Sequence, residues 1–364
     1  MNIGIDARLW YESGVGRYIR NIVRGLENKK TTHTFTIFLN AKAYKEIEFH
    51  NPNFKKVEAD VRWHTISEQW KFKEILERQN LDLVHFPYFS YPVFYSGSFV
   101  ITIHDLIIDH YPTGVSSSHA LPIYYAKYLA YKQITKRAVK NAKKIIVPTI
   151  ATKNELIDHY KAKKEKLELV YEGFDPIIKS GSSKPNLVSK NYILYVGNAY
   201  PHKNLKVLLS SYLQLRKEID IDLVCIGRKD FFYERMENDF SDVFFLHDID
   251  DQSLFDYYTN AKLVVSPSLM EGFGLPILEA MSLSCPVVCA RTSALVEVGD
   301  DAVLYFDPKD GQDLNQQIQK VLQDESLRNS LVKKGLAQSK KFSWNDAVTK
   351  TLKIYESCNS VRQS

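Results

Sequence analysis

Cysteine is scarce in this sequence and is not arranged for metal or disulfide chemistry. Among 364 residues there are only four cysteines, Cys225, Cys285, Cys289 and Cys358, and none forms a C-x-x-C pair. Three of them lie within or beside apolar, strand-like runs, which favours buried, reduced thiols. The spacing therefore argues against a zinc site and against a disulfide-stabilised secreted domain.

Long apolar runs, low-complexity stretches and a large charge excess are also missing. No run approaches the roughly 20 apolar residues that span a bilayer, so any membrane contact is expected to be peripheral. The net charge of +5 is too small to indicate a nucleic acid partner, and 15 glycines and 13 prolines leave little room for disordered tails. The opening MNIGID reads as a strand without a signal sequence, so we expect a cytoplasmic protein.

Short apolar runs alternate with helical patterns along both halves of the chain, which is typical of an α/β fold with parallel sheets and crossover helices. In the first half we expect a helix at about 15–27 and strands at 2–6, 34–39, 81–85, 99–104 and 144–147. In the second half we expect helices at about 203–217, 251–260 and 275–283, and strands at 192–197, 221–226, 243–246, 262–266 and 286–289.

The stretch PIIKSGSSKPNLVSK is polar, aperiodic and rich in Pro, Gly and Ser, so it predicts an interdomain linker. The length of 364 residues suits two domains. We therefore predict a Rossmann-like domain at 1–175, a linker at 176–190, a second Rossmann-like domain at 191–343 and a helical segment within 344–364. Ligands of such sheets bind beyond the carboxyl ends of the strands.

The most informative segment is VVSPSLMEGFGLPILEAMSLSCPVV, in which a glycine turn joins a strand to a helix. Gly272 and Gly274 allow close approach to a ligand, and Pro276 suits the first helical turn. The amides and dipole of this helix start suit a diphosphate or sugar hydroxyls. Glu271 and Glu279 can accept hydrogen bonds from two points of one ligand, although an isolated pair would be read as solvated surface residues.

A second strand-to-helix loop, YVGNAYPHKNL, carries Lys203, whose ammonium can neutralise a diphosphate leaving group. Asn198 and His202 lie in the same loop, and His202 can donate a hydrogen bond there. Arg228 follows another strand and is equally well explained as a solvated loop charge.

Two candidate sites lie in the first half. The loop SGVGRY presents the amides of Gly14 and Gly16 and the charge of Arg17 near the start of a helix. In FVITIHDL, His104 and Asp105 fall where a strand ends, and His104 can donate a hydrogen bond to a sugar hydroxyl or orient the reacting centre. His85 is placed similarly and is better explained as a core histidine.

These segments resemble the family 4 retaining glycosyltransferases, also called glycosyl transferases group 1, which have the GT-B fold. The resemblance rests on the E-x7-E pattern of Glu271 and Glu279, the G-x5-K-N element ending at Asn204, and the T-I-H-D-L element of mannosyltransferase-like members. It implies two Rossmann-like domains with parallel sheets facing a central cleft, and a C-terminal helix at about 345–358 that crosses back to the first domain.

The resemblance also implies roles for individual residues. Glu271 is expected to contact the transferred sugar and Glu279 the nucleotide ribose, while Lys203 faces the diphosphate. Backbone amides for the donor are expected from Gly272, Phe273, Gly274 and Leu275. The glycine loop with Gly14, Gly16 and Arg17 is expected to face the donor phosphates and the acceptor.

The implied reaction is transfer of a hexose from a nucleoside-diphosphate sugar to a glycan or lipid-linked glycan, with retention and without a cofactor. GDP-mannose is the first donor candidate, on the His104–Asp105 element alone. A nucleotide-sugar epimerase of the same fold and a catalytically silent binding protein remain alternatives.

Two departures from the family pattern concern charge and packing. Many relatives have an arginine at one of the positions of Asn198 and His202, so part of the usual positive charge is missing. Ser284 stands where relatives often have glycine.

Two D-x-D patterns, Asp220–Asp222 and Asp248–Asp250, match a motif that holds divalent metal in other glycosyltransferases. The first falls at a strand start and the second runs into a helix cap, so we assign no metal ligand.

The most basic region is the helical stretch 119–144, in which lysines and Arg137 alternate with tyrosines. A solvated face of an amphipathic helix is the favoured interpretation, and docking on anionic lipid near a lipid-linked acceptor is the alternative.

Overall fold

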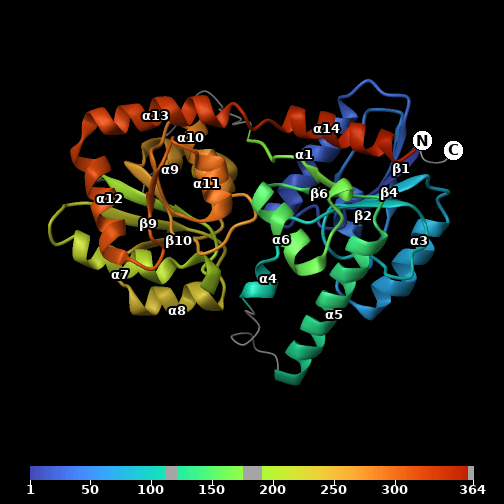
Figure 1. Ribbon diagram of the computed structural model, residues 1–364, viewed down its shortest axis with the longest axis horizontal. Helices are drawn as coiled ribbons and strands as arrows, with labels where there is room; N and C mark the ends of the chain where they lie inside the picture. Colours follow the sequence, from blue (N-terminus) through green and yellow to red (C-terminus); the bar gives the residue numbers. More distant parts are fainter. Residues whose placement is uncertain (112–120, 175–190, 360–364) are drawn as a thin grey trace. The chain divides into compact units, whose positions relative to one another are not determined.

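Residues 1–111, 121–174 and 191–359 are described by the computed structural model, and their contacts divide them into two units (Figure 1). Unit 1 contains the described residues of Met1–Leu106, Gly114–Glu172 and Trp344–Ser364. Unit 2 contains the described residues of Ile107–Thr113 and Gly173–Ser343. The predicted linker at 176–190 and the first two residues of the predicted basic helix, 119–120, lie outside the described residues.

Unit 1 is built on a parallel sheet of seven strands in the order β3-β2-β1-β4-β5-β6-β7. The strands are β1 (Asn2–Asp6), β2 (Thr34–Leu39), β3 (Phe54–Glu58), β4 (Leu83–Phe86), β5 (Phe99–Thr102), β6 (Lys144–Val147) and β7 (Leu167–Leu169). The central strands are fully buried and rich in Ile, Val and Phe, as expected of parallel strands that are covered on both faces. The strand order reverses beside β1, and ligands of such sheets bind beyond the strand ends at this point.

The helices of unit 1 come from three separate parts of the chain. They are α1 (Gly14–Glu27), α2 (Ala41–Glu46), a π-helical turn at Glu68–Phe72, α3 (Lys73–Glu77), α5 (Leu121–Asn141), α6 (Ile150–Tyr160), a short turn at Lys164–Lys166 and α14 (Trp344–Ser357).

The helices α1 and α14 pack directly against each other in unit 1. A Cβ atom at Gly25 of α1 would lie only 2.3 Å from a methyl carbon of Val348, so the two helices can approach this closely because residue 25 has no side chain. Trp344 and Tyr355 of α14 belong to the same buried cluster as the apolar face of α1. Helix α14 is therefore part of the hydrophobic core of unit 1.

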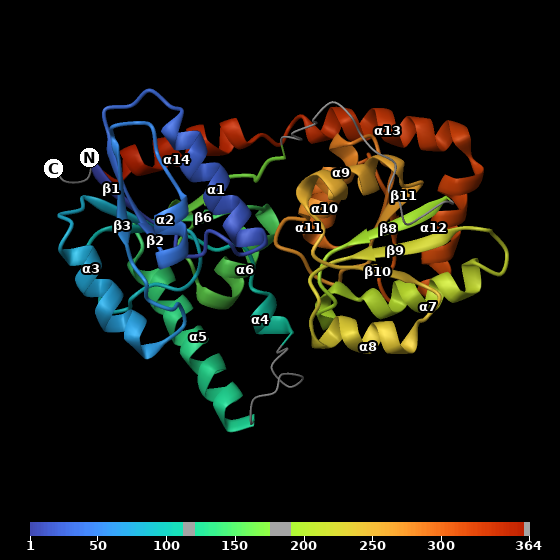
Figure 2. The ribbon, with the colours of Figure 1, turned by 180° about the vertical axis from the view of Figure 1, so that it is seen from behind.

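Unit 2 has a parallel sheet of six strands in the order β10-β9-β8-β11-β12-β13. The strands are β8 (Tyr192–Val196), β9 (Asp222–Ile226), β10 (Phe244–Leu246), β11 (Leu263–Ser266), β12 (Val287–Ala290) and β13 (Leu304–Phe306). Figure 2 shows α7 and α8 on one side of this sheet and α9 and α10 on the other.

The helical segments of unit 2 include those that connect its strands, together with α4 from an earlier part of the chain and two helices after the last strand. They are α4 (Ile107–His110), a 3-10 turn at Pro201–Lys203, α7 (Leu205–Leu215), α8 (Phe231–Asp239), α9 (Asp251–Asn260), α10 (Leu275–Ser282), α11 (Ser293–Gly299), α12 (Gly311–Gln323) and α13 (Glu325–Ser339).

The predicted α/β fold class with parallel sheets is confirmed, and every strand expected from the sequence is present within two residues of its predicted ends. Three strands were not predicted: β3, β7 and β13, each at the edge of its sheet. Of the cysteines, Cys225, Cys285 and Cys289 are buried, and all four thiols are free.

Candidate active site

Two neighbouring strands of unit 2 bring the main motif residues together. Strands β8 and β11 pair in parallel where the strand order reverses, and Lys203 and Glu271 lie beyond their carboxyl ends. Lys203 Nζ donates hydrogen bonds to both carboxylate oxygens of Glu271, at 2.7 and 2.9 Å. The two side chains are only 15% and 9% exposed, so water screens this ion pair far less than a surface pair.

Glu271 also accepts a hydrogen bond from the hydroxyl of Ser268 at 2.6 Å. Burial by itself would raise the pKa of Glu271, but the charge and hydrogen bonds of Lys203, together with Ser268, bring the pKa below its ordinary value. The carboxyl group is therefore ionised at neutral pH and able to accept hydrogen bonds from a ligand.

Helix α10 begins immediately after the glycine turn. Gly274 precedes the helix with φ of 103°, a left-handed conformation in which a side chain would be strained and would meet Leu295. Pro276 occupies the first turn of the helix, so the glycine turn lies at the positive end of the helix dipole. Gly272 and Phe273 are buried within the turn, and Leu275 is half-buried.

Glu279 lies inside α10 and is 2% exposed. Its carboxylate accepts a hydrogen bond from the hydroxyl of Tyr258, on α9, at 2.6 Å. Tyr258 is itself fully buried, so its hydrogen bond holds the Glu279 carboxylate in one orientation.

The loop between β8 and α7, in which many relatives have an arginine, carries the neutral imidazole of His202. His202 is 6% exposed, and its Nδ1 has no hydrogen-bond partner among the described residues. Burial and the neighbouring Lys203 lower the pKa of His202 to about 4, so the ring is uncharged at neutral pH. The side-chain oxygen of Asn198 accepts a hydrogen bond from the amide of Tyr200 at 3.2 Å and thereby stabilises the loop. Arg228 is exposed after β9.

In unit 1, the two glycines of SGVGRY have different surroundings. A Cβ atom at Gly16 would lie 2.7 Å from the carbonyl oxygen of Leu9 and 2.8 Å from that of Trp10, so this glycine is required for packing. No atom lies within 4 Å of a Cβ placed at Gly14, the first residue of α1. The space at Gly14 is therefore open for a ligand beside the helix start, and Arg17 lies half-buried in the following turn.

His104 lies two residues beyond β5 and forms an ion pair that was not predicted. Its Nδ1 is 2.9 Å from the carboxylate of Glu172, which follows β7, and its Nε2 is 3.1 Å from the carbonyl oxygen of Pro87. The ring of Tyr18 packs edge-on against His104, with 4.8 Å between ring centroids. Asp105 follows in the chain and is half-buried.

His85 is a fully buried core histidine, as expected from the sequence. Its ring nitrogens lie 2.6 Å from the hydroxyl of Tyr355 and 2.8 Å from that of Thr102, which in turn is 3.0 Å from the hydroxyl of Tyr18. Burial lowers the pKa of His85 to about 3, so the ring is neutral. This polar chain ties α14 to the residues that surround His104.

The two D-x-D patterns have structural explanations. Asp222 begins β9, at the amino end of the strand and therefore away from the ligand-binding edge. Asp250 caps α9, where its carboxylate accepts a hydrogen bond from the amide of Ser253 at 2.8 Å.

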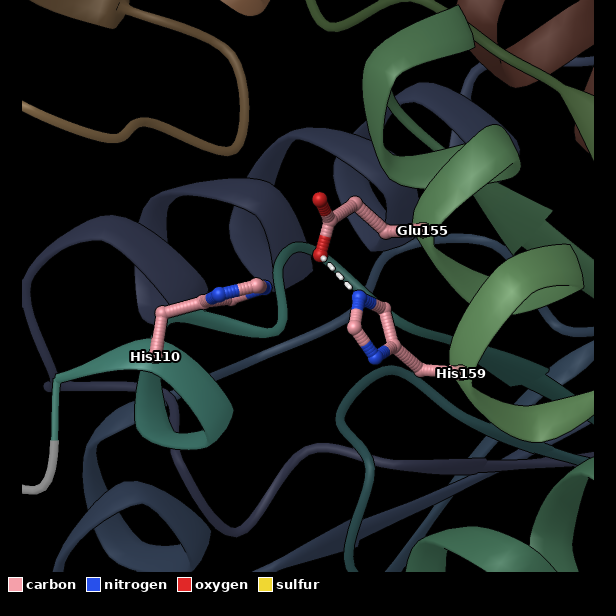
Figure 3. A group of neighbouring side chains, drawn as sticks. All are labelled: His110, Glu155 and His159. Carbon is pink, nitrogen blue, oxygen red and sulfur yellow. Dashed lines mark ion pairs between the residues drawn. The ribbon is translucent and has the colours of Figure 1, made fainter.

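Figure 3 shows another acidic and histidine pair, Glu155 and His159 on α6, whose side chains are 3.6 Å apart. They lie four residues apart on a partly exposed face of the helix, the spacing at which side chains of one helix meet. His110, also drawn in Figure 3, belongs to unit 2.

Family models match both parts of the chain. The model for Glycosyltransferase Family 4 matches residues 13–177, and that for Glycosyl transferases group 1 matches residues 180–338. The chain belongs to glycosyltransferase family 4. It is therefore a glycosyltransferase, and the predicted resemblance is confirmed.

Curated relatives of this family 4 glycosyltransferase include the O-antigen chain mannosyltransferase B of Escherichia coli, 37% identical over 181 residues. That match spans about half of each protein, 48% of this chain and 48% of the relative. An uncharacterized glycosyltransferase of Methanocaldococcus jannaschii is 27% identical over 355 residues, which cover 95% of each chain.

A solved structure of sucrose-phosphate synthase from Thermosynechococcus elongatus matches the fold of this glycosyltransferase with a TM-score of 0.77. The match covers 99% of this chain and 100% of that one at 19% identity, so it bears on the GT-B fold alone.

Three residues that contact the predicted site escaped the sequence analysis: Ser268, Tyr258 and Glu172. Ser268 lies in the motif segment itself, three residues before Glu271, and its hydroxyl was the available signal. Tyr258 and Glu172 belong to no recognisable motif. Tyr258 lies 21 positions from Glu279 in the chain, and Glu172 lies 68 positions from His104, so no local pattern links either pair.

Proposed function

We propose that this glycosyltransferase transfers a hexose, with mannose as the first candidate, from a nucleoside-diphosphate sugar to a glycan or lipid-linked glycan. The reaction proceeds with retention at the anomeric carbon and without a metal ion. The observation that carries the proposal is the buried Lys203–Glu271 pair beside the start of α10.

The Lys203–Glu271 pair suits the two sides of the sugar–phosphate bond that is broken. A cation and a carboxylate separated by one hydrogen bond, 2.7 Å, lie close enough for one ligand to engage both at its phosphate–sugar junction. Lys203 and the amides at the start of α10 stabilise the charge of the departing diphosphate. Glu271 accepts hydrogen bonds from the sugar and stabilises the positive charge that develops on its ring.

Glu279 is proposed to accept hydrogen bonds from the ribose hydroxyls. Its carboxylate is held by Tyr258 at 2.6 Å, which supports a fixed acceptor for a rigid part of the donor. In unit 1, Gly14, Gly16 and Arg17 are proposed to face phosphate and acceptor groups, and His104 with Asp105 to orient the sugar that reacts.

The choice of mannose is supported by the relative named O-antigen chain mannosyltransferase B and by the His104–Asp105 element. The same name supports a polysaccharide acceptor. We propose a cytoplasmic location at which such a glycan is assembled.

Peripheral membrane contact is proposed for α5. Ile123, Tyr125 and Leu129 are 51%, 58% and 62% exposed, which is unusual for apolar side chains. Figure 1 shows the first half of α5 extending away from the strands of unit 1, and three exposed basic residues follow on the same helix, Lys136, Arg137 and Lys140. Apolar residues followed by cations support docking on an anionic bilayer. No helix among the described residues is long and apolar enough to cross one.

A screen of nucleotide sugars by thermal shift, followed by mass analysis of products with candidate glycan acceptors, tests the proposal. Donors that bind raise the melting temperature, and the product mass identifies the transferred sugar. An epimer formed from donor alone would favour the epimerase alternative, and binding without turnover would favour the silent binding protein.

A further inference from the structure

The hydrogen bonds of His104 define its protonation state. Both ring nitrogens have a partner, Nδ1 the carboxylate of Glu172 at 2.9 Å and Nε2 the carbonyl oxygen of Pro87 at 3.1 Å. A carbonyl oxygen and a carboxylate accept hydrogen bonds, so with Glu172 in its carboxylate form both nitrogens donate. An imidazole ring that donates from both nitrogens carries two protons and a positive charge.

We infer that Glu172 is a positioning residue that holds His104 as a cation with a fixed ring orientation at the carboxyl edge of the unit 1 sheet. The consequence for catalysis rests on the proposed function, in which His104 orients the reacting sugar. The inference adds a residue from the end of β7, an edge strand, to that site.

The surroundings of the pair support a charged ring. The side chains of His104 and Glu172 are 15% and 6% exposed, so their attraction is weakly screened. Burial by itself would lower the pKa of His104, but Glu172, the Pro87 carbonyl and Asp105 together raise it above its ordinary value.

The other titratable groups that face the ring carry no charge at neutral pH. Burial raises the pKa of the Tyr18 hydroxyl and lowers that of His85 to about 3. Among the described residues, Asp105 and Glu172 are the anions that raise the pKa of His104, and Glu172 does so through a direct hydrogen bond.

The two hydrogen bonds that His104 makes differ in strength, and we therefore assign them different roles. The bond to the Glu172 carboxylate is charge-assisted and joins two largely buried groups, whereas the bond to Pro87 has a neutral acceptor. A donor oxygen that replaces the Pro87 carbonyl would accept the hydrogen bond from Nε2 while Nδ1 continues to donate to Glu172. His104 then offers a charged hydrogen bond to the anionic donor without a change in its protonation state.

The protonation state can be measured directly on the full chain, without a substrate. Histidine-labelled protein is followed by long-range proton–nitrogen NMR spectra from pH 6 to pH 9, and His104→Asn identifies the signals of His104. We expect both nitrogens of His104 to be protonated at pH 7.5, while His85 serves as a neutral ring in the same spectrum. A neutral His104 in the unaltered protein at pH 7.5 overturns the inference.

Glu172→Gln keeps the shape of the side chain and removes its charge. We expect the titration midpoint of His104 to fall by about one pH unit or more, since one unit corresponds to the loss of a tenfold preference for the charged ring. Glu172→Asp should restore part of the shift. Glu168→Gln, which removes a carboxylate of β7 that pairs with Lys144, is the matched control and should leave the midpoint unchanged. An unchanged midpoint in Glu172→Gln contradicts the inference even if the wild-type ring is charged.

The pH profile of kcat/KM with GDP-mannose separates this inference from the proposed function. We expect the alkaline limb of the profile to move to lower pH in Glu172→Gln and to recover in Glu172→Asp. Absence of any transfer from GDP-mannose counts against the proposed donor, whereas the NMR result still decides the role of Glu172. The NMR midpoint of His104 can shift in Glu172→Gln while the pH profile of activity stays unchanged. That result shows that the charge of His104 has no part in catalysis, and it overturns the proposed consequence for catalysis.

Discussion

Lys203 Nζ lies 2.7 and 2.9 Å from the two carboxylate oxygens of Glu271, so the two strongest motifs of the sequence meet in one ion pair. Each partner satisfies the charge of the other while no donor is bound. In the proposed mode of binding, a diphosphate at Lys203 competes with Glu271 for the ammonium and frees carboxylate oxygens for the sugar.

Replacement of Lys203 by alanine should lower kcat/KM by about two to four orders of magnitude, the scale of a lost electrostatic contact to a leaving group. Steady-state kinetics with saturating acceptor measure the change. Lys206→Ala removes an exposed lysine one turn away and is the control. A loss of less than threefold in Lys203→Ala would remove this residue from the active site.

The two glutamates should differ in the kind of defect that their glutamine variants cause. Glu279→Gln should mainly raise the donor KM and weaken binding of the free nucleoside diphosphate, because a ribose contact is made about equally in ground and transition states. Glu271→Gln should lower kcat by about tenfold to a thousandfold and leave nucleoside diphosphate binding nearly intact, because it acts where charge develops.

Calorimetry with the nucleoside diphosphate, beside kinetics on both variants, makes this comparison. Tyr258→Phe removes the hydrogen bond that orients Glu279 and should reproduce part of the Glu279→Gln defect. The assignment is wrong if Glu271→Gln abolishes nucleoside diphosphate binding while Glu279→Gln does not affect it.

Transfer should continue in the presence of a chelator of divalent cations. In the proposed site, Lys203 and the helix start supply positive charge to the diphosphate, and Asp250 of the second D-x-D pattern caps α9. Initial rates with and without chelator, and after addition of manganese, measure the dependence. Complete loss in chelator with recovery in manganese would contradict metal-independent transfer.

His85 should make the protein less stable as the pH falls. The pKa of His85 is about 3 in the folded state, against an ordinary value of 6.5. Below pH 6.5 the unfolded chain therefore binds a proton at His85, whereas the folded chain does not. Between pH 7 and pH 5 this lowers the free energy of unfolding by about 2 kcal/mol.

Urea denaturation of the full chain at pH 7 and at pH 5 tests this dependence of stability on pH. His85→Gln should reduce the loss of stability between the two pH values by about that amount, about 2 kcal/mol. His50→Gln, at an exposed position, should leave the pH dependence as it is in the unaltered protein. Equal pH dependence in His85→Gln and the unaltered protein would show that His85 titrates normally.

Binding of α5 to anionic vesicles should fall steeply with salt and with substitution of Lys136, Arg137 and Lys140 by serine. Sedimentation with vesicles of anionic and of neutral lipid measures the effect. Serine at Lys309, Lys333 and Lys340, which are exposed in unit 2, makes the same change in net charge and should leave binding intact. Absent or salt-insensitive binding would make α5 an ordinary solvated helix.

The sequence predicted the central strands better than the edges of the sheets. Strands such as β5 and β11 are buried on both faces, and their apolar runs are unmistakable. The edge strand β3 has the sequence FKKVE, in which the exposed Lys55 and the half-buried Lys56 interrupt the apolar pattern. The edge strands β7 and β13 have only three residues each. Edge strands tolerate charge because one side is open to water, so periodicity alone does not identify them.

The candidate site was predictable where motif and topology act together. Lys203 and Glu271 follow β8 and β11, the two strands that meet where the strand order of a Rossmann-like sheet reverses, so their proximity follows from the predicted fold. The contact between His104 and Glu172 could not be predicted, because it depends on the path of two loops after separate strands. Ser284 is explained by the structure: its φ of 61° is left-handed, which is why glycine suits this position beyond the end of α10.

Unit 1 is not continuous in the chain, and this affects the order of its synthesis. Helix α14, which buries Trp344 and Tyr355 in the core of unit 1, is translated only after all of unit 2. While the ribosome is still making unit 2, α1 lacks the contact of Gly25 with Val348, and His85 Nδ1 lacks the hydroxyl of Tyr355. Unit 1 therefore cannot complete its core until α14 has been made, although its first residues are the first to be translated.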